Sequence, residues 1–129
     1  MFDKTILVVD DDEMILMMLG KILSKQFNVI TAVSGEAALE KYGANRPDLI
    51  LSDYMMPGMN GLQMMDKLRA IYGSDVYAVF MTANEQEETE FEVFRHGALH
   101  FIKKPIKADV LIDAIKFSLE KIDDMKRND

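Results

Sequence analysis

Polar side chains that could act together each follow a short apolar run in this 129-residue sequence. Asp10 and Asp11 follow the first run, and Asp53, Thr82 and Lys104 follow three later ones. Carboxylates at close range repel one another, and a hard divalent cation with oxygen ligands relieves that repulsion. The group contains no His or Cys, which argues against Zn²⁺ or Cu. These residue types therefore predict a Mg²⁺ site.

An ammonium and a hydroxyl beside carboxylates supply what phosphoryl transfer needs. Mg²⁺, the Lys104 ammonium and the Thr82 hydroxyl can each take one phosphoryl oxygen in the transition state. A carboxylate that stays free can attack phosphorus and form an acyl phosphate. Asp53 is the candidate nucleophile because it stands alone after its apolar run, whereas Asp10 and Asp11 form a pair that is left to bind metal.

Alternating patterns predict the elements that position these residues. Short apolar segments predict five strands, and amphipathic spacing between them predicts five helices. The predicted strands cover residues 6–9, 29–31, 49–51, 76–81 and 99–102, and the helices cover 13–26, 35–42, 62–68, 87–96 and 111–122. We expect Asp12 and Ser34 to cap the first two helices. The polar residues 123–129 are expected to fray.

Five strands that alternate with five helices predict an α/β fold with a parallel sheet covered on both faces. Right-handed crossovers restrict such a sheet to a few doubly wound strand orders. Ligands of these sheets bind outside the carboxyl ends of the strands. Because the polar residues all follow strands, we expect them to converge there although they lie far apart in the sequence.

Composition excludes several classes of protein. The length fits one domain over residues 1–129. A net charge of -7 disfavours direct nucleic-acid binding. There is no cysteine, so disulfides are excluded and a reducing cytoplasm is the simplest location. No apolar run approaches the roughly 20 residues that cross a bilayer, and the polar start of the chain is unlike a signal peptide.

Four segments that contain these residues resemble the CheY-like receiver domains of two-component response regulators. They are Val8-Val9-Asp10-Asp11-Asp12, residues 51–61, Met81-Thr82-Ala83 and Lys103-Lys104-Pro105. Their occurrence in this order at strand ends is far more specific than any one of them alone. The resemblance spans nearly the whole chain and implies a flavodoxin-like sheet in the order 2-1-3-4-5.

The resemblance also implies a role for each matching position around the metal. Asp53 is the phosphoacceptor and a metal ligand. Asp11 binds Mg²⁺ directly, Asp10 binds it through water, and the backbone carbonyl of Met55 is a further ligand. Mn²⁺ is expected to substitute for Mg²⁺.

Other roles concern the response to phosphorylation. Lys104 contacts the phosphoryl group, and the Lys104–Pro105 peptide is expected to be cis. Thr82 turns inward to bond the phosphoryl group, and Phe101 follows it as the aromatic switch residue. The surface formed by the fourth helix, fifth strand and fifth helix then changes.

The resemblance implies a phosphorelay switch that catalyses its own phosphorylation and slow autodephosphorylation, without the turnover of an ordinary enzyme. The donor is a phosphohistidine on a histidine kinase or a histidine phosphotransfer protein. A downstream effector or an output domain outside this sequence reads the changed surface, and phosphorylation-dependent homodimerisation is left open. Neither nucleic acid nor a membrane is an expected partner of this domain.

This sequence differs from the family pattern at two positions, Phe101 and Met55. Phe101 lacks the hydroxyl of a tyrosine, so readout through that hydroxyl is in doubt, although burial of the ring could still report the state. Met55 is apolar at a position that can influence an attacking water. We hypothesise that Met55 and Asn84 together tune the lifetime of the phosphoryl group.

Three other functions compete with a phosphorylated receiver. A flavodoxin-like nucleotide binder needs a hydroxyl- or glycine-rich phosphate loop after the first strand, where this chain has three aspartates. A phosphatase of the haloacid dehalogenase type needs Asp-x-Asp followed by a small residue and Thr, which residues 10–14 do not supply. A degenerate receiver that only binds protein is disfavoured because every residue needed for the chemistry is present.

Overall fold

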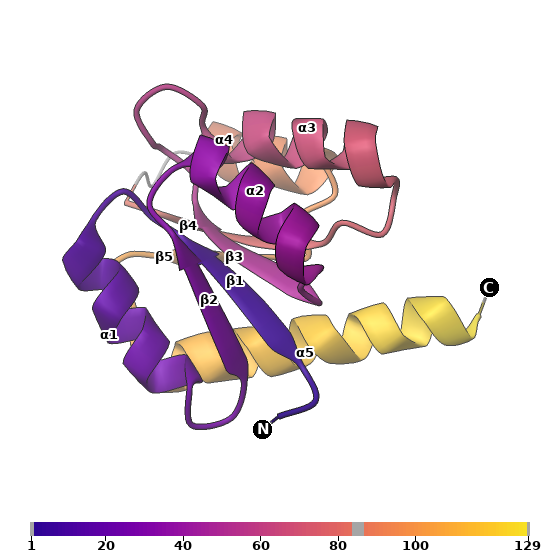
Figure 1. Ribbon diagram of the computed structural model, residues 1–129, viewed down its shortest axis with the longest axis horizontal. Helices are drawn as coiled ribbons and strands as arrows, with labels where there is room; N and C mark the ends of the chain where they lie inside the picture. Colours follow the sequence, from indigo (N-terminus) through magenta and orange to yellow (C-terminus); the bar gives the residue numbers. More distant parts are fainter. Residues whose placement is uncertain (1, 84–86, 129) are drawn as a thin grey trace.

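Strands and helices alternate along the chain in the computed structural model, which describes residues 2–83 and 87–128 (Figure 1). The elements in order are β1 (Thr5–Val9), α1 (Glu13–Leu23), β2 (Asn28–Ala32), α2 (Gly35–Asn45), β3 (Leu49–Asp53), α3 (Gly61–Tyr72), β4 (Ala78–Thr82), α4 (Glu87–Arg95), β5 (His100–Lys103) and α5 (Ala108–Arg127). All strand pairs are parallel, in the order β2-β1-β3-β4-β5. The predicted flavodoxin-like fold is confirmed.

The sheet separates two hydrophobic cores, with α1 and α5 on one face and α2, α3 and α4 on the other (Figure 1). Side chains of β1 alternate between them: Ile6 and Val8 enter the first core, and Leu7 and Val9 enter the second. All four are fully buried. Each such side chain contributes about 1.5–3 kcal/mol through removal of apolar surface from water, so the central strands hold the site edge firmly.

The first two helices begin at the residues that were expected to cap them. The Asp12 carboxylate accepts hydrogen bonds from the backbone N–H groups of Met14 and Ile15, and the Ser34 hydroxyl accepts one from Ala37. Both predicted caps are confirmed. Because the Asp12 carboxylate caps α1, Asp10 and Asp11 are the two of these three consecutive aspartates that remain for the metal site.

Helix α5 ends at Arg127, five residues beyond the end that the apolar spacing predicted at residue 122. The helix therefore includes most of the polar segment 123–129, whose fraying stays a prediction. Ile122 is buried and Met125 packs against the first core, so the apolar stripe extends beyond the two aspartates that suggested an end. Lys4 also pairs with Asp123 at 3.4 Å. No helix within residues 2–83 or 87–128 is long and apolar enough to span a membrane.

Strand β4 begins two residues later than predicted and ends at Thr82. The carbonyl of Val76 accepts hydrogen bonds from Nε and Nη2 of the Arg69 guanidinium, at 3.3 and 3.1 Å. A side chain therefore satisfies this carbonyl before the strand starts. Thr82 remains in register with Lys103 at the opposite end, which fixes its position at the site edge.

Candidate functional site

Parallel pairing brings the ends of four strands to one edge of the sheet. Asp10 directly follows β1, and Asp53 is the last residue of β3. Beyond the paired strands, the backbone N–H of Tyr54 donates to the carbonyl of Met81 at 2.8 Å. In the same way the N–H of Lys104 donates to the carbonyl of Thr82 at 2.8 Å. The predicted site residues are therefore positioned by backbone hydrogen bonds.

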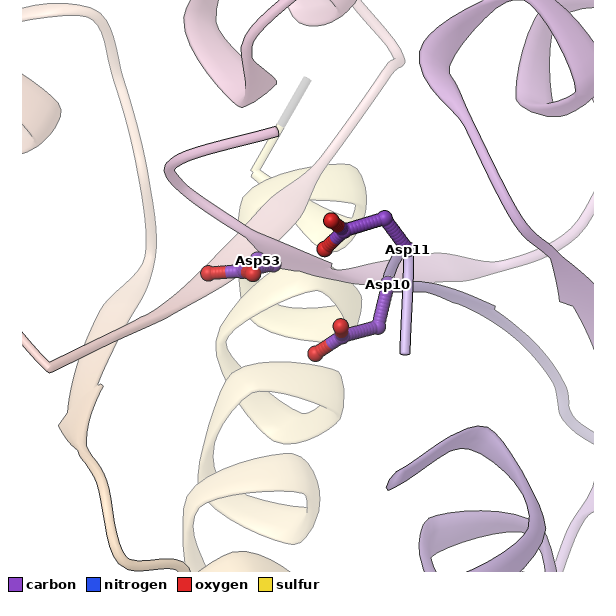
Figure 2. A group of neighbouring side chains, drawn as sticks. All are labelled: Asp10, Asp11 and Asp53. Atoms are coloured by element: carbon purple, nitrogen blue, oxygen red, sulfur yellow. The ribbon is translucent and has the colours of Figure 1, made fainter. Parts of the chain in front are cut away.

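Three carboxylates meet at this edge, as Figure 2 shows. One oxygen each from Asp10, Asp11 and Asp53 lies within 4.8 Å of the others. Asp10 is 1% exposed and Asp53 is 7% exposed, whereas Asp11 is exposed. The Asp10 carboxylate is oriented by the backbone N–H of Asp12, which donates to Oδ1 at 2.9 Å. An all-oxygen donor group of this size suits a hard divalent cation.

The Lys104 ammonium lies between two of these carboxylates. Its Nζ is 3.2 Å from Oδ2 of Asp10 and 3.4 Å from Oδ2 of Asp53. Burial by itself lowers the pKa of Lys104, but Asp53 and Asp10 outweigh it and raise that pKa above its usual value. The ammonium therefore stays charged throughout the physiological pH range.

The Asp53 carboxyl experiences opposing influences. Burial raises its pKa most, the Lys104 ammonium lowers it, and the charge of Asp10 raises it again. A hydrogen bond from the Met55 backbone lowers it further, yet the net pKa is above the ordinary value. A buried carboxyl group with a raised pKa is a common feature of reactive sites.

A cleft of about 450 Å³ opens beside Asp53 and is also lined by Met55, Thr82, Ala83 and Lys104. Thr82 is 1% exposed at the end of β4, whereas the Met55 side chain is exposed at the rim. The carboxylate, the hydroxyl and the ammonium that were predicted to act on one group therefore border one space. The function of the Met55 carbonyl stays a prediction.

The remaining predicted positions lie around this cleft. The Lys104–Pro105 peptide, for which the resemblance implied the cis isomer, is cis. Phe101 lies on β5 opposite Phe80 of β4, is partly buried and packs against the second core. The switch function of Phe101 is not tested by this arrangement. Asn84, which we paired with Met55 in a hypothesis on phosphoryl lifetime, lies outside the described residues.

Sequence reasoning missed the connections of Tyr54, the residue after Asp53. Its ring packs edge-on against Phe80, with centroids 6.5 Å apart, and its hydroxyl donates to Oε2 of Glu92 on α4 at 3.2 Å. Burial and the Glu92 carboxylate raise the pKa of Tyr54. An aromatic residue beside the acceptor was the only signal, because the partner lies 38 residues away.

Gly61 is a second residue with contacts that the sequence did not predict, because its sequence context indicated only a turn. A Cβ atom on Gly61 would lie 2.6 Å from Cε1 of Phe80 and 2.8 Å from the backbone oxygen of Asp53. The N–H of Gly61 also donates to the carbonyl of Tyr54 at 3.0 Å. The absence of a side chain lets α3 approach the backbone of the candidate acceptor.

Comparison with known families and proteins gives a consistent result. A family model described as the response regulator receiver domain matches residues 6–116. Sporulation initiation phosphotransferase F of Bacillus subtilis is 32% identical over 90% of this chain and 94% of its own length. Chemotaxis protein CheY of the same species is 34% identical over 88% of this chain and 96% of its own length.

Similarity also extends to a longer protein and to a solved structure. The chain is 32% identical to hybrid signal transduction histidine kinase D of Dictyostelium discoideum over 83% of its residues, which span 7% of that kinase. The crystal structure of a CheY-like response regulator receiver domain protein from Methanospirillum hungatei superposes with a TM-score of 0.85 at 27% identity, covering 95% of this chain and 98% of that one.

Proposed function

The chain belongs to the response regulator receiver family, and on this basis we propose that Asp53 accepts a phosphoryl group from a phosphohistidine. The donor is a histidine kinase or a histidine phosphotransfer protein. The observation that carries the proposal is the convergence of the Asp10, Asp11 and Asp53 carboxylates with the Lys104 ammonium at one cleft. The name of the similar phosphotransferase F supports the same class of reaction.

The acidic group fits Mg²⁺, with Mn²⁺ as a substitute. Asp10, Asp11 and Asp53 would hold the ion, together with the backbone carbonyl of Met55. Two of these carboxylates are almost fully buried, and among the residues that the structure describes, Lys104 supplies the one ammonium that pairs with both of them. When bound, the ion supplies positive charge that offsets carboxylate repulsion and stabilises phosphoryl oxygens.

The side chains perform distinct tasks in the transfer. An oxygen of Asp53 forms a bond to phosphorus while the N–P bond of the phosphohistidine breaks. The imidazole nitrogen of the donor keeps the electron pair of that bond and takes a proton from solvent. Lys104, already 3.4 Å from the attacking carboxylate, stabilises a phosphoryl oxygen, and the Thr82 hydroxyl binds another.

Labelling by a small phosphodonor tests this proposal without a partner protein. We expect acetyl phosphate with Mg²⁺ to add one phosphoryl group, and EDTA to prevent the addition. Asp53→Asn should abolish labelling because the amide is not a nucleophile. Asp12→Asn is the matched control, because it makes the same change at the residue that directly follows the Asp10–Asp11 pair, and Asn caps a helix as well as Asp.

Persistent labelling of Asp53→Asn would remove Asp53 from the role of acceptor. A folded wild-type protein that takes no label with Mg²⁺ would instead support a degenerate receiver that acts only by binding protein. Loss of label in both Asp12→Asn and Asp53→Asn would show that labelling depends on the total negative charge around the cleft and not on Asp53 as the acceptor.

We further propose that phosphorylation changes the surface formed by α4, β5 and α5 through Thr82 and Phe101. Thr82 lines the cleft, and Phe101 pairs with the neighbouring strand. An effector, an output domain or a second copy of the chain would read the change. Because a ligand shifts a conformational equilibrium only by its differential affinity, beryllofluoride should alter amide signals of α4–β5–α5 in wild type and much less in Thr82→Ala. Equal changes in both would exclude Thr82 from the switch.

A further inference from the structure

The methionines that the structure describes differ widely in exposure, and Met59 and Met125 are half-buried. Met14, Met17 and Met18 on α1 are 80%, 70% and 42% exposed, and Met55 at the cleft rim is 61% exposed. The methionines buried in the cores are Met56, Met64, Met65 and Met81, none more than 7% exposed. Within the described residues, every methionine that is exposed thus lies on α1 or on the loop after β3. Of these, Met14 in the first turn of α1 and Met55 at the cleft are on the side of the carboxylates.

Three of these side chains form one continuous strip, which we call the α1 methionine face: Met14, Met17 and Met18. Residues three and four apart on a helix are surface neighbours, so Met14 is a neighbour of both Met17 and Met18. A groove of about 330 Å³ between α1 and β2 continues the apolar surface, and Met17 and the exposed Val33 both line it. Scattered exposed apolar residues are ordinary, but a contiguous strip indicates contact with another molecule.

The strip begins beside the candidate site. Asp12 caps α1 and directly follows Asp11, so Met14 lies on the first turn next to the acidic group. The Asp53 side chain is 10% exposed at the base of its cleft. A donor protein that delivers a phosphoryl group to it must therefore cover the surrounding rim. Methionine suits such a contact because its flexible thioether adapts to a partner surface.

A thioether also has chemistry that leucine lacks. Its sulfur attacks one oxygen of hydrogen peroxide, the O–O bond breaks, and a sulfoxide and water form, so the sulfur is oxidised by two electrons while the peroxide is reduced. The product is polar, and thiol-dependent sulfoxide reductases return it to the thioether. A sulfoxide on an apolar contact surface loses its hydration when the surface is covered, which weakens the contact.

We propose that the α1 methionine face is a site of reversible oxidation by peroxide, and that its oxidation slows phosphoryl transfer from a protein donor. The inference rests on the proposed function, because it assumes transfer to Asp53. Acetyl phosphate needs no protein contact, so its reaction depends on the cleft and is indifferent to α1. Oxidation of this face should therefore slow transfer from a protein donor and leave labelling by acetyl phosphate unchanged.

The first experiment maps oxidation by peptide mass spectrometry during exposure of the folded protein to hydrogen peroxide. Met14 and Met17 should react at least about tenfold faster than Met64 and Met81, which serve as controls within the same molecule. Uniform oxidation of all methionines, or resistance of the α1 residues, would overturn the proposal.

The second experiment compares transfer before and after peroxide treatment. The donor is a purified, autophosphorylated histidine kinase chosen from a panel because it transfers to this chain. We expect the transfer rate to fall about tenfold, the effect of one poorly paired polar group at a contact, and to recover after treatment with sulfoxide reductases for both epimers. The ratio of the transfer rate after peroxide treatment to the rate before it is also measured for the triple variant Met14→Leu, Met17→Leu, Met18→Leu, which retains Met55.

The ratio for the triple variant should be close to one, whatever its starting rate, because no oxidisable sulfur remains on α1. An equal loss in wild type and triple variant would assign the sensitivity to Met55 or another residue and overturn the proposal. So would unchanged transfer by fully oxidised wild type. Failure of the proposed function gives a different result, since acetyl phosphate would then fail to label Asp53 even before oxidation.

Discussion

Asp53 lies where burial and charge act in opposite directions on a single carboxyl. Burial and Asp10 disfavour its ionised form, and Lys104 favours it. The balance leaves its pKa raised, so the folded state holds this proton more tightly than the unfolded state does. The ionised form of Asp53, which is the form that can attack phosphorus, is therefore destabilised in the metal-free fold.

Replacement of Asp53 by Asn should stabilise the metal-free protein at pH 7. The raised pKa means that the contribution of Asp53 to stability is full below its unfolded pKa and is lost as the pH rises through the folded pKa. Asn removes this loss, so its melting temperature should exceed that of wild type by roughly 2–5 °C at pH 7. Thermal unfolding in EDTA measures this difference, which should shrink as the pH falls towards the pKa. A lower melting temperature for Asp53→Asn at pH 7 would contradict the account of the site.

Lys104 and Lys103 offer a matched comparison of two neighbouring ammonium groups. Lys104 contacts Asp10 and Asp53, whereas Lys103 is exposed at the end of β5. Lys104→Met should slow labelling by acetyl phosphate by about 10²-fold, the usual cost of one lost electrostatic donor. Lys103→Met should label at nearly the wild-type rate. Similar rates for the two variants, measured with Mg²⁺ at one pH, would exclude a specific contact of Lys104 with the phosphoryl group.

Helices α3 and α4 are tied to the site by contacts that cross long stretches of sequence. Gly61 lets α3 approach Asp53, and Tyr54 reaches α4 through Glu92. The Arg69 guanidinium also donates to the carbonyl of His96, just beyond α4, as well as to Val76. The element that is proposed to signal is therefore connected both to the residue after the acceptor and to α3.

Two glycines in helices should respond in opposite ways to alanine. Gly61→Ala places a methyl group against Phe80 and the backbone of Asp53, so it should destabilise the fold by about 1–3 kcal/mol. Gly20 is inside α1 with no atom within 4 Å of an added Cβ. Gly20→Ala should therefore stabilise by about 0.5–1 kcal/mol. Urea unfolding measures both, and a gain in stability for Gly61→Ala would refute the close approach of α3.

Tyr54→Phe should loosen α4 without unfolding the protein. The change removes the hydroxyl that binds Glu92 but keeps the ring that packs on Phe80. Loss of one exposed hydrogen bond costs about 0.5–1 kcal/mol, which predicts amide exchange about two- to fivefold faster in α4. Glu90→Gln, at an exposed position of the same helix, is the control. Unchanged exchange in Tyr54→Phe, with hydrogen exchange read by NMR, would show that the contact does not hold α4.

At the scale of the whole molecule, two cores on a parallel sheet bring residues 10, 53, 82 and 104 together. Each of these residues directly follows or ends a short apolar strand, and this local pattern made both the fold and the acidic group predictable. Ties such as Tyr54–Glu92 and Arg69–His96 were not predictable, because they join residues 38 and 27 positions apart with no local signal. The end of α5 was mistaken for a different reason: Met125 continues the apolar stripe three residues after Ile122, but the two aspartates between them suggested an end.

The central claim is that these converging residues make Asp53 the phosphoacceptor. The most direct test is to treat the protein with acetyl phosphate and Mg²⁺, reduce any acyl phosphate with borohydride, and locate the resulting homoserine by peptide mass spectrometry. The account predicts homoserine at position 53 only, and none in the presence of EDTA. Homoserine at another aspartate, or at position 53 without divalent metal, would contradict it.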